Sequence, residues 1–448
     1  MTTAANLPVT AGFDAEWGER ALARAAAAQE PKWALERRRA AAGLAGTLPF
    51  PSHDDELWRR TDFRAVQAAL PKLDPFAAPE RALRVSDLPD AIVGHLAGDA
   101  ESLALVVQRD GTVVFEQTPA ALTRQGVVVS SMERALREHG ARLEPVLGSL
   151  LPPDYDRYVA IGAALQSGGA FVYVPDGVEA VLPIRLIHWL DGGGKLAAPR
   201  TVVILGREAR ATVIEELLSA NADAPSFHDG GTEVFLGDGA KLVYGTLQDW
   251  GRNVYHCSNH RARVGRGAEL QWIQTMLGAA MAKANSYFDL AGEGSSAFVN
   301  GFLFGDERQH FHLHTLQRHL VPHTTSDLLI KSCLKDRARS VYQGLIQVSE
   351  GAQRTDAYQA NRNLLLSESA RADSIPGLEI LANDVRCTHG ATIGHVDAEQ
   401  MYYLMARGLP RLEAQRLIVE GFFAPVLDRI PLEAVRDQLR DVIRHKIG

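Results

Sequence analysis

A turn of similar sequence recurs through the middle of the chain and separates short strand-like runs. Its first copies begin at positions 205, 236 and 264, which lie 31 and 28 residues apart. This interval suits the coils of a solenoid. Some later copies are separated by about half of this interval, which indicates two turns per coil. The copies are Leu205-Gly-Arg-Glu-Ala-Arg, Leu236-Gly-Asp-Gly-Ala-Lys, Val264-Gly-Arg-Gly-Ala-Glu, Leu290-Ala-Gly-Glu-Gly-Ser, Leu334-Lys-Asp-Arg-Ala-Arg, Val348-Ser-Glu-Gly-Ala-Gln and Leu366-Ser-Glu-Ser-Ala-Arg.

Short β-branched runs lie between these turns. Thr201–Leu205 and Leu270–Gln274 are examples, and the region contains no long helical pattern. Gly-x-Gly turns also punctuate antiparallel sheets, so a sandwich or a barrel is the alternative. The absence of helices favours a parallel β-helix, and we predict a mainly β protein.

Helix-forming sequence flanks this core. We predict an N-terminal helical region over residues 1–100 and a β-helix core over 101–395, with a helical insertion near 132–165. Residues 396–448 are predicted to form a C-terminal helical domain. Such a tail either docks a partner or caps the open end of a solenoid.

Helix ends are marked on both sides of the core. Pro31 separates the helix formers Ala15–Gln29 from Trp33–Ala42. In the tail, Asp397–Arg407 is expected to be a helix that stops at Gly408. Two further helices are predicted by an apolar face at Ala414, Leu417, Ile418, Gly421 and Phe422, and by the run Leu432–Ile443.

Composition excludes several classes of function. A net charge of −7 offers no basic surface for nucleic acid, and the basic run Arg37–Arg39 is interpreted as a solvated helix face. No apolar run is long enough to span a membrane, and the N-terminus lacks the order of a signal peptide. A cytoplasmic location is therefore expected. The three cysteines form no CxxC pair and no disulfide framework.

Histidines alternate on one strand, at His310, His312 and His314. Alternate residues share a face, and neutral imidazole binds iron, zinc or copper. Three rings on one flat strand do not reach a single metal without a bend, so a solvated polar face is favoured over a metal site there.

A second pair, Cys387 and His389, has the same i, i+2 relation. A thiolate and an imidazole on one face provide half of a soft-metal or iron–sulfur site, or else a nucleophile and its base. Cys257 and Cys333 are interpreted as buried small hydrophobes.

The sequence carries none of the common catalytic signatures. GxxxxGK[ST], GxSxG and HExxH are all absent, so this chain is not expected to bind a nucleotide or to be an enzyme. A β-helix polysaccharide lyase or hydrolase is a remote alternative, since the carboxylates are scattered among the corner turns. An assembly or binding role is favoured.

Several ordered motifs resemble the SufB/SufD family of the SUF system, which assembles iron–sulfur clusters. The resemblance covers about Val321 to Phe423, with one further segment near the N-terminus. The motifs are Trp58-Arg-Arg-Thr-Asp-Phe63, Pro322-His-Thr-Thr-Ser326, Ala352-Gln-Arg-Thr-Asp-Ala357, Asn363-Leu-Leu-Leu-Ser367, Pro376-Gly-Leu-Glu-Ile380, Asp384-Val-Arg-Cys-Thr-His-Gly-Ala-Thr-Ile-Gly394 and Tyr403-Leu-Met-Ala-Arg-Gly408.

Within that family the chain resembles SufD rather than SufB. SufB proteins carry a glutamate where this chain has Gly390, and cysteines at Asn361 and near Val264. These departures imply that the sulfur-accepting thiols of SufB are missing here. The resemblance implies a right-handed parallel β-helix between helical terminal domains.

The resemblance also implies partners. SufB would pair with this chain through the β-helix, and the two would share a transient iron–sulfur cluster or iron held here by Cys387 and His389. SufC, an ABC-type ATPase, would dock on the C-terminal helices. The residues expected to dock it are Tyr403, Leu404, Arg407, Gly408 and Phe422. A homodimer in the absence of SufB and a SufB-like role, in which this chain itself carries the cluster, remain alternatives.

Overall fold

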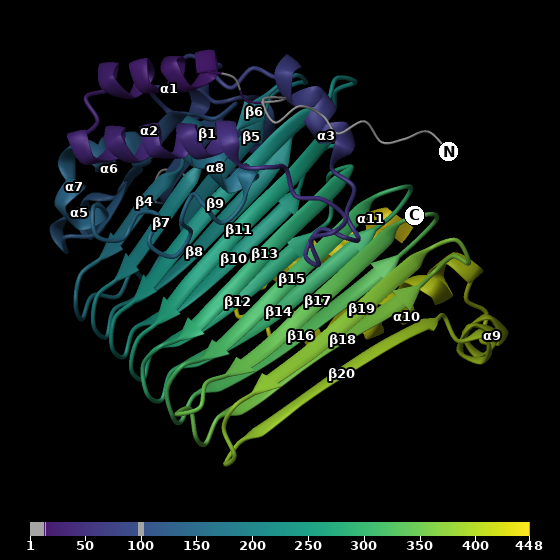
Figure 1. The fold of residues 1–448 in the computed structure, drawn as a ribbon. Coiled ribbons are helices and arrows are strands. Elements are labelled where there is room, and N and C mark those ends of the chain that lie inside the picture. Colours follow the sequence, from purple (N-terminus) through teal and green to yellow (C-terminus); the bar gives the residue numbers. More distant parts are fainter. Residues whose placement is uncertain (1–12, 14, 97–102, 448) are drawn as a thin grey trace.

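The computed structural model describes residue 13 and residues 15–96 and 103–447. Over these residues the chain forms a parallel β-helix of about eight turns, with helices packed near both ends (Figure 1). The prediction of a parallel β-helix is therefore confirmed, and the alternative of a sandwich or barrel is wrong.

Two parallel sheets form the walls of the β-helix, and the chain passes from one to the other at every corner. The first sheet has the order β2-β1-β5-β8-β10-β12-β14-β16-β18-β20. Its strands are β1 Ala104–Arg109, β2 Thr112–Gln117, β5 Ile184–Leu190, β8 Arg210–Ser219, β10 Lys241–Asp249, β12 Glu269–Met276, β14 Ser296–Gly305, β16 Thr325–Leu334, β18 Asp356–Leu365 and β20 Arg386–His395.

The second sheet has the order β19-β17-β15-β13-β11-β9-β7-β4-β3, with β6 beside β9. Its strands are β3 Val128–Ser131, β4 Ala170–Val174, β6 Leu196–Ala197, β7 Arg200–Leu205, β9 Ser226–Leu236, β11 Val254–Val264, β13 Met281–Leu290, β15 His310–His319, β17 Arg339–Val348 and β19 Arg371–Ile380. Antiparallel pairing occurs only in the pairs β1 with β2 and β3 with β4, among the described strands.

The predicted corner turns lie between strands, as their sequences required. β7 ends at Leu205 and β8 begins at Arg210, and β9 and β10 flank the next copy in the same way. Apolar side chains that point inward from both sheets fill the space between them. Trp272 is fully buried there and stacks on Tyr244, with ring centroids 4.4 Å apart.

Helices cover the outer faces of the two sheets. Their bounds are α1 Ala15–Ala27, α2 Lys32–Thr47, α3 Arg64–Ala69, η1 Leu70–Lys72, η2 Val85–Asp87, α4 Asp90–Leu96, α5 Ala120–Arg124, α6 Met132–Glu138, α7 Gly140–Leu143, α8 Arg157–Leu165, α9 Ala398–Ala406, α10 Arg411–Leu427 and α11 Glu433–Ile447. The N-terminal segment and α8 pack on the second sheet around Phe227 and Cys257, whereas α10 and α11 pack on the first sheet around Phe302 and Cys333. Both of these cysteines are buried, as predicted.

One prediction for the flanking helices is confirmed and another is wrong. Gly408 follows α9 with a φ of +92°, which confirms the predicted stop. The interpretation of Arg37–Arg39 as a solvated face is wrong for its central residue. Arg38 is buried and donates to both carboxylate oxygens of Glu30 at 2.5 and 2.8 Å, because α2 lies against α8 rather than in solvent.

Close stacking of the corners demands glycine at position 278. A Cβ added at Gly278 would lie 2.1 Å from the carbonyl oxygen of Trp250 in the preceding coil. Gly278→Ala is therefore expected to lower the free energy of unfolding by about 2 kcal/mol, measured by urea denaturation. Gly351→Ala is the matched control, because its Cβ would meet no described atom within 4 Å. Equal stability of the two variants would contradict the prediction.

Candidate functional site at the open end of the β-helix

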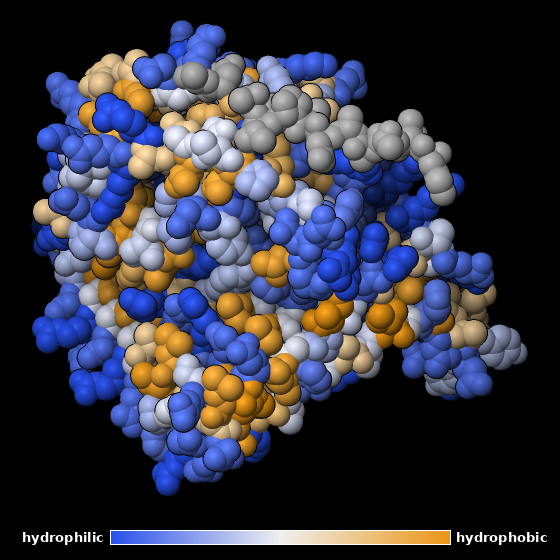
Figure 2. All heavy atoms as spheres, viewed as in Figure 1, coloured by the Kyte–Doolittle hydropathy of each residue, from blue (hydrophilic) through white to orange (hydrophobic). Residues whose placement is uncertain are grey.

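The β-helix ends with a coil that no further coil covers. Among the described strands, β20 pairs only with β18 and β19 only with β17, so both have a free edge. Large apolar side chains are exposed around this end, at Leu378, Ile380, Leu381 and Ile393. Figure 2 shows hydrophobic residues gathered at the lower end of the molecule, where the last coils lie.

Cys387 and His389 point to the inner side of this last coil. His389 is the register partner of Gln359, which is itself the partner of Leu328, a residue of the interior core. Cys387 packs with interior residues of the preceding coils. Since alternate residues share a face, both side chains lie on the inner face of β20. His389 is exposed because the stack ends there.

A hydrogen-bonded chain forms the floor beneath His389. The side chain of Gln359 is fully buried and donates to the carbonyl oxygens of Gly344 and Gly377 at 3.4 and 3.2 Å. The hydroxyl of Tyr342 donates to Gln359 Oε1 at 3.3 Å and lies 3.0 Å from that of Thr315. The floor is therefore rigid and polar, and it lies one strand below His389.

Sequence reasoning missed this floor, although one signal marks it. Gly344 lies in the middle of β17, and a Cβ there would meet the hydroxyl of Tyr342 at 2.2 Å and Gln359 Oε1 at 2.6 Å. Glycine within a strand often marks such a close approach.

The thiol of Cys387 is not activated by its surroundings. Burial, with a smaller contribution from the Asp356 carboxylate, raises the pKa of Cys387 above its usual value. The neutral thiol is therefore favoured until a metal or a positive group from outside approaches. Among the described residues, no three His, Cys, Asp or Glu side chains are grouped closely enough to hold a metal ion.

The three histidines of β15 occupy a different environment from the one expected. His312 is fully buried and His314 is 8% exposed, so the interpretation as a solvated face is wrong. The segment around Thr61 covers them: Thr61 Oγ1 lies 2.5 Å from His312 Nδ1, and His312 Nε2 lies 2.8 Å from Gln343 Oε1. His314 Nδ1 lies 2.9 Å from the hydroxyl of Tyr287.

These buried rings should make the fold sensitive to acid. Burial lowers the pKa of His314 to about 3 from 6.5, so between these values the unfolded state binds a proton that the folded state does not. Stability is therefore lost as the pH falls below 6.5, by about 2 kcal/mol at pH 5 for this residue. His314→Gln is expected to reduce the loss by that amount in urea denaturation at pH 7 and pH 5. An unchanged pH dependence would contradict this.

The C-terminal helices carry most of the residues expected to dock a partner. Tyr403 is exposed on α9, and the guanidinium of Arg407 lies 5.0 Å from the centre of its ring. A groove of about 430 Å³ is lined by Glu399, Gln400, Tyr403, Leu404 and Ile418. Phe422 lies elsewhere: its ring faces Lys331 of β16, and its carbonyl accepts a hydrogen bond from that lysine.

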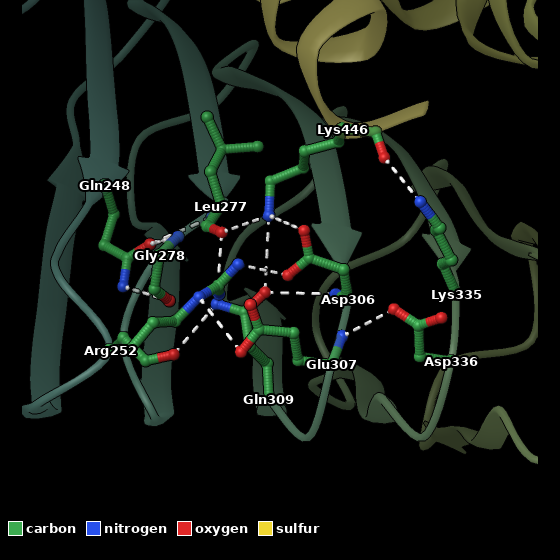
Figure 3. Close-up of polar contacts among 11 residues, drawn as sticks. Gln248, Arg252, Leu277, Gly278, Asp306, Glu307, Gln309, Lys335, Asp336 and Lys446 are labelled. Carbon is green, nitrogen blue, oxygen red and sulfur yellow. Dashed lines mark hydrogen bonds and ion pairs between the residues drawn. The ribbon is translucent and has the colours of Figure 1, made fainter. Parts of the chain in front are cut away.

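The end of α11 is anchored to the corners of the β-helix (Figure 3). Lys446 Nζ donates to the carbonyl of Leu277 at 2.8 Å and lies 3.4 Å from Asp306 Oδ2. Arg252 contacts the other oxygen of the same carboxyl group. Lys335 in turn donates to the carbonyl of Lys446 at 3.1 Å. Because the side chain of Lys446 is only 8% exposed, this contact fixes α11 firmly to the β-helix.

Comparison with known proteins identifies the class. Residues 188–422 match the SufBD core domain of SUF system FeS cluster assembly, and residues 91–186 match the SufBD protein N-terminal region. The chain therefore belongs to the SufB/SufD family of iron–sulfur cluster assembly proteins.

Particular relatives come from both branches of the family. The chain is 29% identical to the iron–sulfur cluster assembly protein SufD of Bacillus subtilis, over 94% of this chain and 95% of the relative. It is 26% identical to SufB of the same organism, over 90% and 87%. A SufBD family protein of Staphylococcus epidermidis is 25% identical over the same shares. No helix in the described part of the chain is long and apolar enough to cross a membrane.

Proposed function

We propose that this chain is a SufD-type scaffold subunit that pairs with a SufB-type subunit through its open end. The observation that carries the proposal is the inward pair Cys387 and His389 on a coil that no other described strand covers. Two ligands from this chain leave the coordination of iron or of a nascent cluster incomplete, and a second subunit supplies the rest. The cluster is cargo that is held between the subunits and passed on.

The surface of the open end supports this pairing. Free strand edges offer unpaired backbone donors and acceptors to an added strand. The exposed Leu378, Ile380 and Ile393 offer apolar area that contact with a partner would remove from water. Both features surround Cys387 and His389, so one partner would cover them together.

The C-terminal helices are proposed to dock the ATPase SufC. α9 presents Tyr403, Leu404 and Arg407 beside a groove, and Gly408 lets the chain turn directly into α10. Phe422 lies away from this groove, and its contact with Lys331 holds α10 on β16. Nucleotide-driven movement of SufC would reach the open end through α10, which packs on β14 and β16.

The test is co-purification of the tagged chain with its neighbouring SufB and SufC, followed by assays of iron and acid-labile sulfide. A complex of all three, with cluster only in that complex, is the expected result. Ile393→Lys is a matched interface variant, because Ile393 is exposed and a charge there should block pairing but not SufC binding. A chain that stays alone and ignores both partners would refute the proposal.

The SufB-like alternative rests on the similar identity to the SufB relative. It predicts that the isolated chain binds both iron and sulfide. The same assays, performed on the chain purified without SufB, therefore separate the two roles.

A further inference from the structure

A cavity of about 260 Å³ lies near the other end of the β-helix, between α2, the loop 145–153 and α8. Its base is formed by Arg200 of β7 and Glu233 of β9. Four strands of the second sheet, β11, β13, β15 and β17, separate β9 from β19. The cavity is thus distinct from the open end.

The walls of the cavity are mainly apolar. Ala34, Leu147, Leu151, Pro153 and Ala163 line it. For scale, a cavity of roughly 150 Å³ with an aliphatic lining accepts benzene, so this one holds an apolar body of about eight carbon atoms.

Most charges around the cavity already have partners. Arg38 is paired with Glu30 through two hydrogen bonds. The carboxylate of Glu233 accepts hydrogen bonds from the backbone N–H groups of Gly148, Leu150 and Leu151 at 2.7, 2.8 and 3.2 Å. Glu233 therefore holds the loop in place.

Two arginines that line the cavity, Arg37 and Arg200, have no ion pair to a carboxylate among the described residues, and of these only Arg200 is buried. Its side chain is 7% exposed, it donates to the carbonyl of Val159 at 3.0 Å, and among the described residues no ion pair joins it to a carboxylate. Asp229, Glu233 and Asp156 lie near it, but burial raises the pKa of each of these carboxyl groups above its usual value and so weakens each as a counter-charge. A buried guanidinium without a paired anion is costly, and an anion in the cavity would offset that cost.

The position of this guanidinium is specified by the backbone beneath it. A Cβ added at Gly231 would lie 2.1 Å from Arg200 Nη1, so glycine there leaves room for the charge. The arrangement combines a buried, fixed guanidinium that has no direct ion pair with a mainly apolar wall.

We propose that this cavity binds a small amphipathic monoanion, a medium-chain carboxylate, with its carboxylate on Arg200 and its chain against α2 and the loop 145–153. Arg37 donates to the carbonyls of Glu144 and Leu147 at 2.8 and 2.9 Å, and so ties α2 to the beginning of that loop. Binding would therefore hold the N-terminal helices more firmly on the β-helix.

The experiment compares sodium octanoate with 1-octanol by isothermal titration calorimetry on the full-length protein at pH 7. The two probes share a chain length and differ in the charged head. Octanoate is expected to bind at least tenfold more tightly than octanol, and Arg200→Gln is expected to abolish that preference. Ala163→Leu, which fills the cavity, should remove the binding of both probes.

Arg39→Gln is the matched control, since Arg39 is exposed on α2 and does not line the cavity. It makes the same change of charge and should leave both affinities unchanged. Equal binding of octanoate and octanol by the unmodified protein, or octanoate binding that survives Ala163→Leu, would overturn the proposal. These two outcomes do not depend on the folding of Arg200→Gln.

Discussion

Replacing His389 by alanine is expected to reduce the iron and acid-labile sulfide of the purified three-subunit complex by roughly tenfold or more, with the complex intact. The magnitude follows from the loss of one ligand at a site where even neighbouring groups change metal affinity by about 10- to 100-fold. Folding should be unaffected, because His389 is exposed at the end of the stack and no described hydrogen bond involves its ring. The measurement is cluster content per complex after size-exclusion chromatography.

The control for this variant is His395→Ala. His395 is exposed, ends the same strand and lies six positions beyond His389. The substitution His395→Ala removes an imidazole with little change in the surface of the open end, and it should leave cluster content near that of the unmodified complex. Undiminished cluster assembly by His389→Ala, in a complex of ordinary composition, would remove His389 from the site.

The coils of this fold were predictable because their signals are local and repeated. Each turn, such as Leu205-Gly-Arg-Glu-Ala-Arg, ends one strand and begins the next within a few residues. That Cys387 and His389 share one face of a strand followed from strand periodicity alone, whereas their inward direction came from the register of the coils. The residues that lie beneath them could not be predicted in this way, because Gln359 meets His389 only through the register of two strands that are 30 positions apart.

The two wrong predictions of solvated faces share one physical cause: segments that are distant in the sequence pack over these residues and bury them. The strand at His310–His314 has the alternation of a solvated face, yet Thr61 and its neighbours, some 250 positions earlier, bury it. Arg38 was likewise placed in solvent because nothing in α2 itself reveals that α8 lies against it. Contacts of this kind depend on how whole elements pack, which short-range patterns do not encode.

Phe423→Ala is expected to release the C-terminal helices from the β-helix locally. Phe423 is fully buried, and its ring stacks on Phe302 with centroids 4.0 Å apart. Truncation of a buried phenylalanine costs about 3–5 kcal/mol, and here the loss falls on the interface between α10 and the first sheet. Faster hydrogen exchange in α10, together with loss of SufC from the purified complex, is the expected result.

Leu417→Ala provides the control on the same helix, since Leu417 is exposed and does not contact the first sheet's core. It should leave hydrogen exchange in α10 unchanged. The anchor at Lys446 adds a second test, because its hydrogen bond to Leu277 and its ion pair with Asp306 hold the end of α11, whereas Phe423 holds α10. Lys446→Met with Phe423→Ala should therefore expose α11 as well as α10. If the double variant exchanges no faster than Phe423→Ala alone, the Lys446 anchor does not hold α11, and movement of a docked ATPase must reach the β-helix through α10.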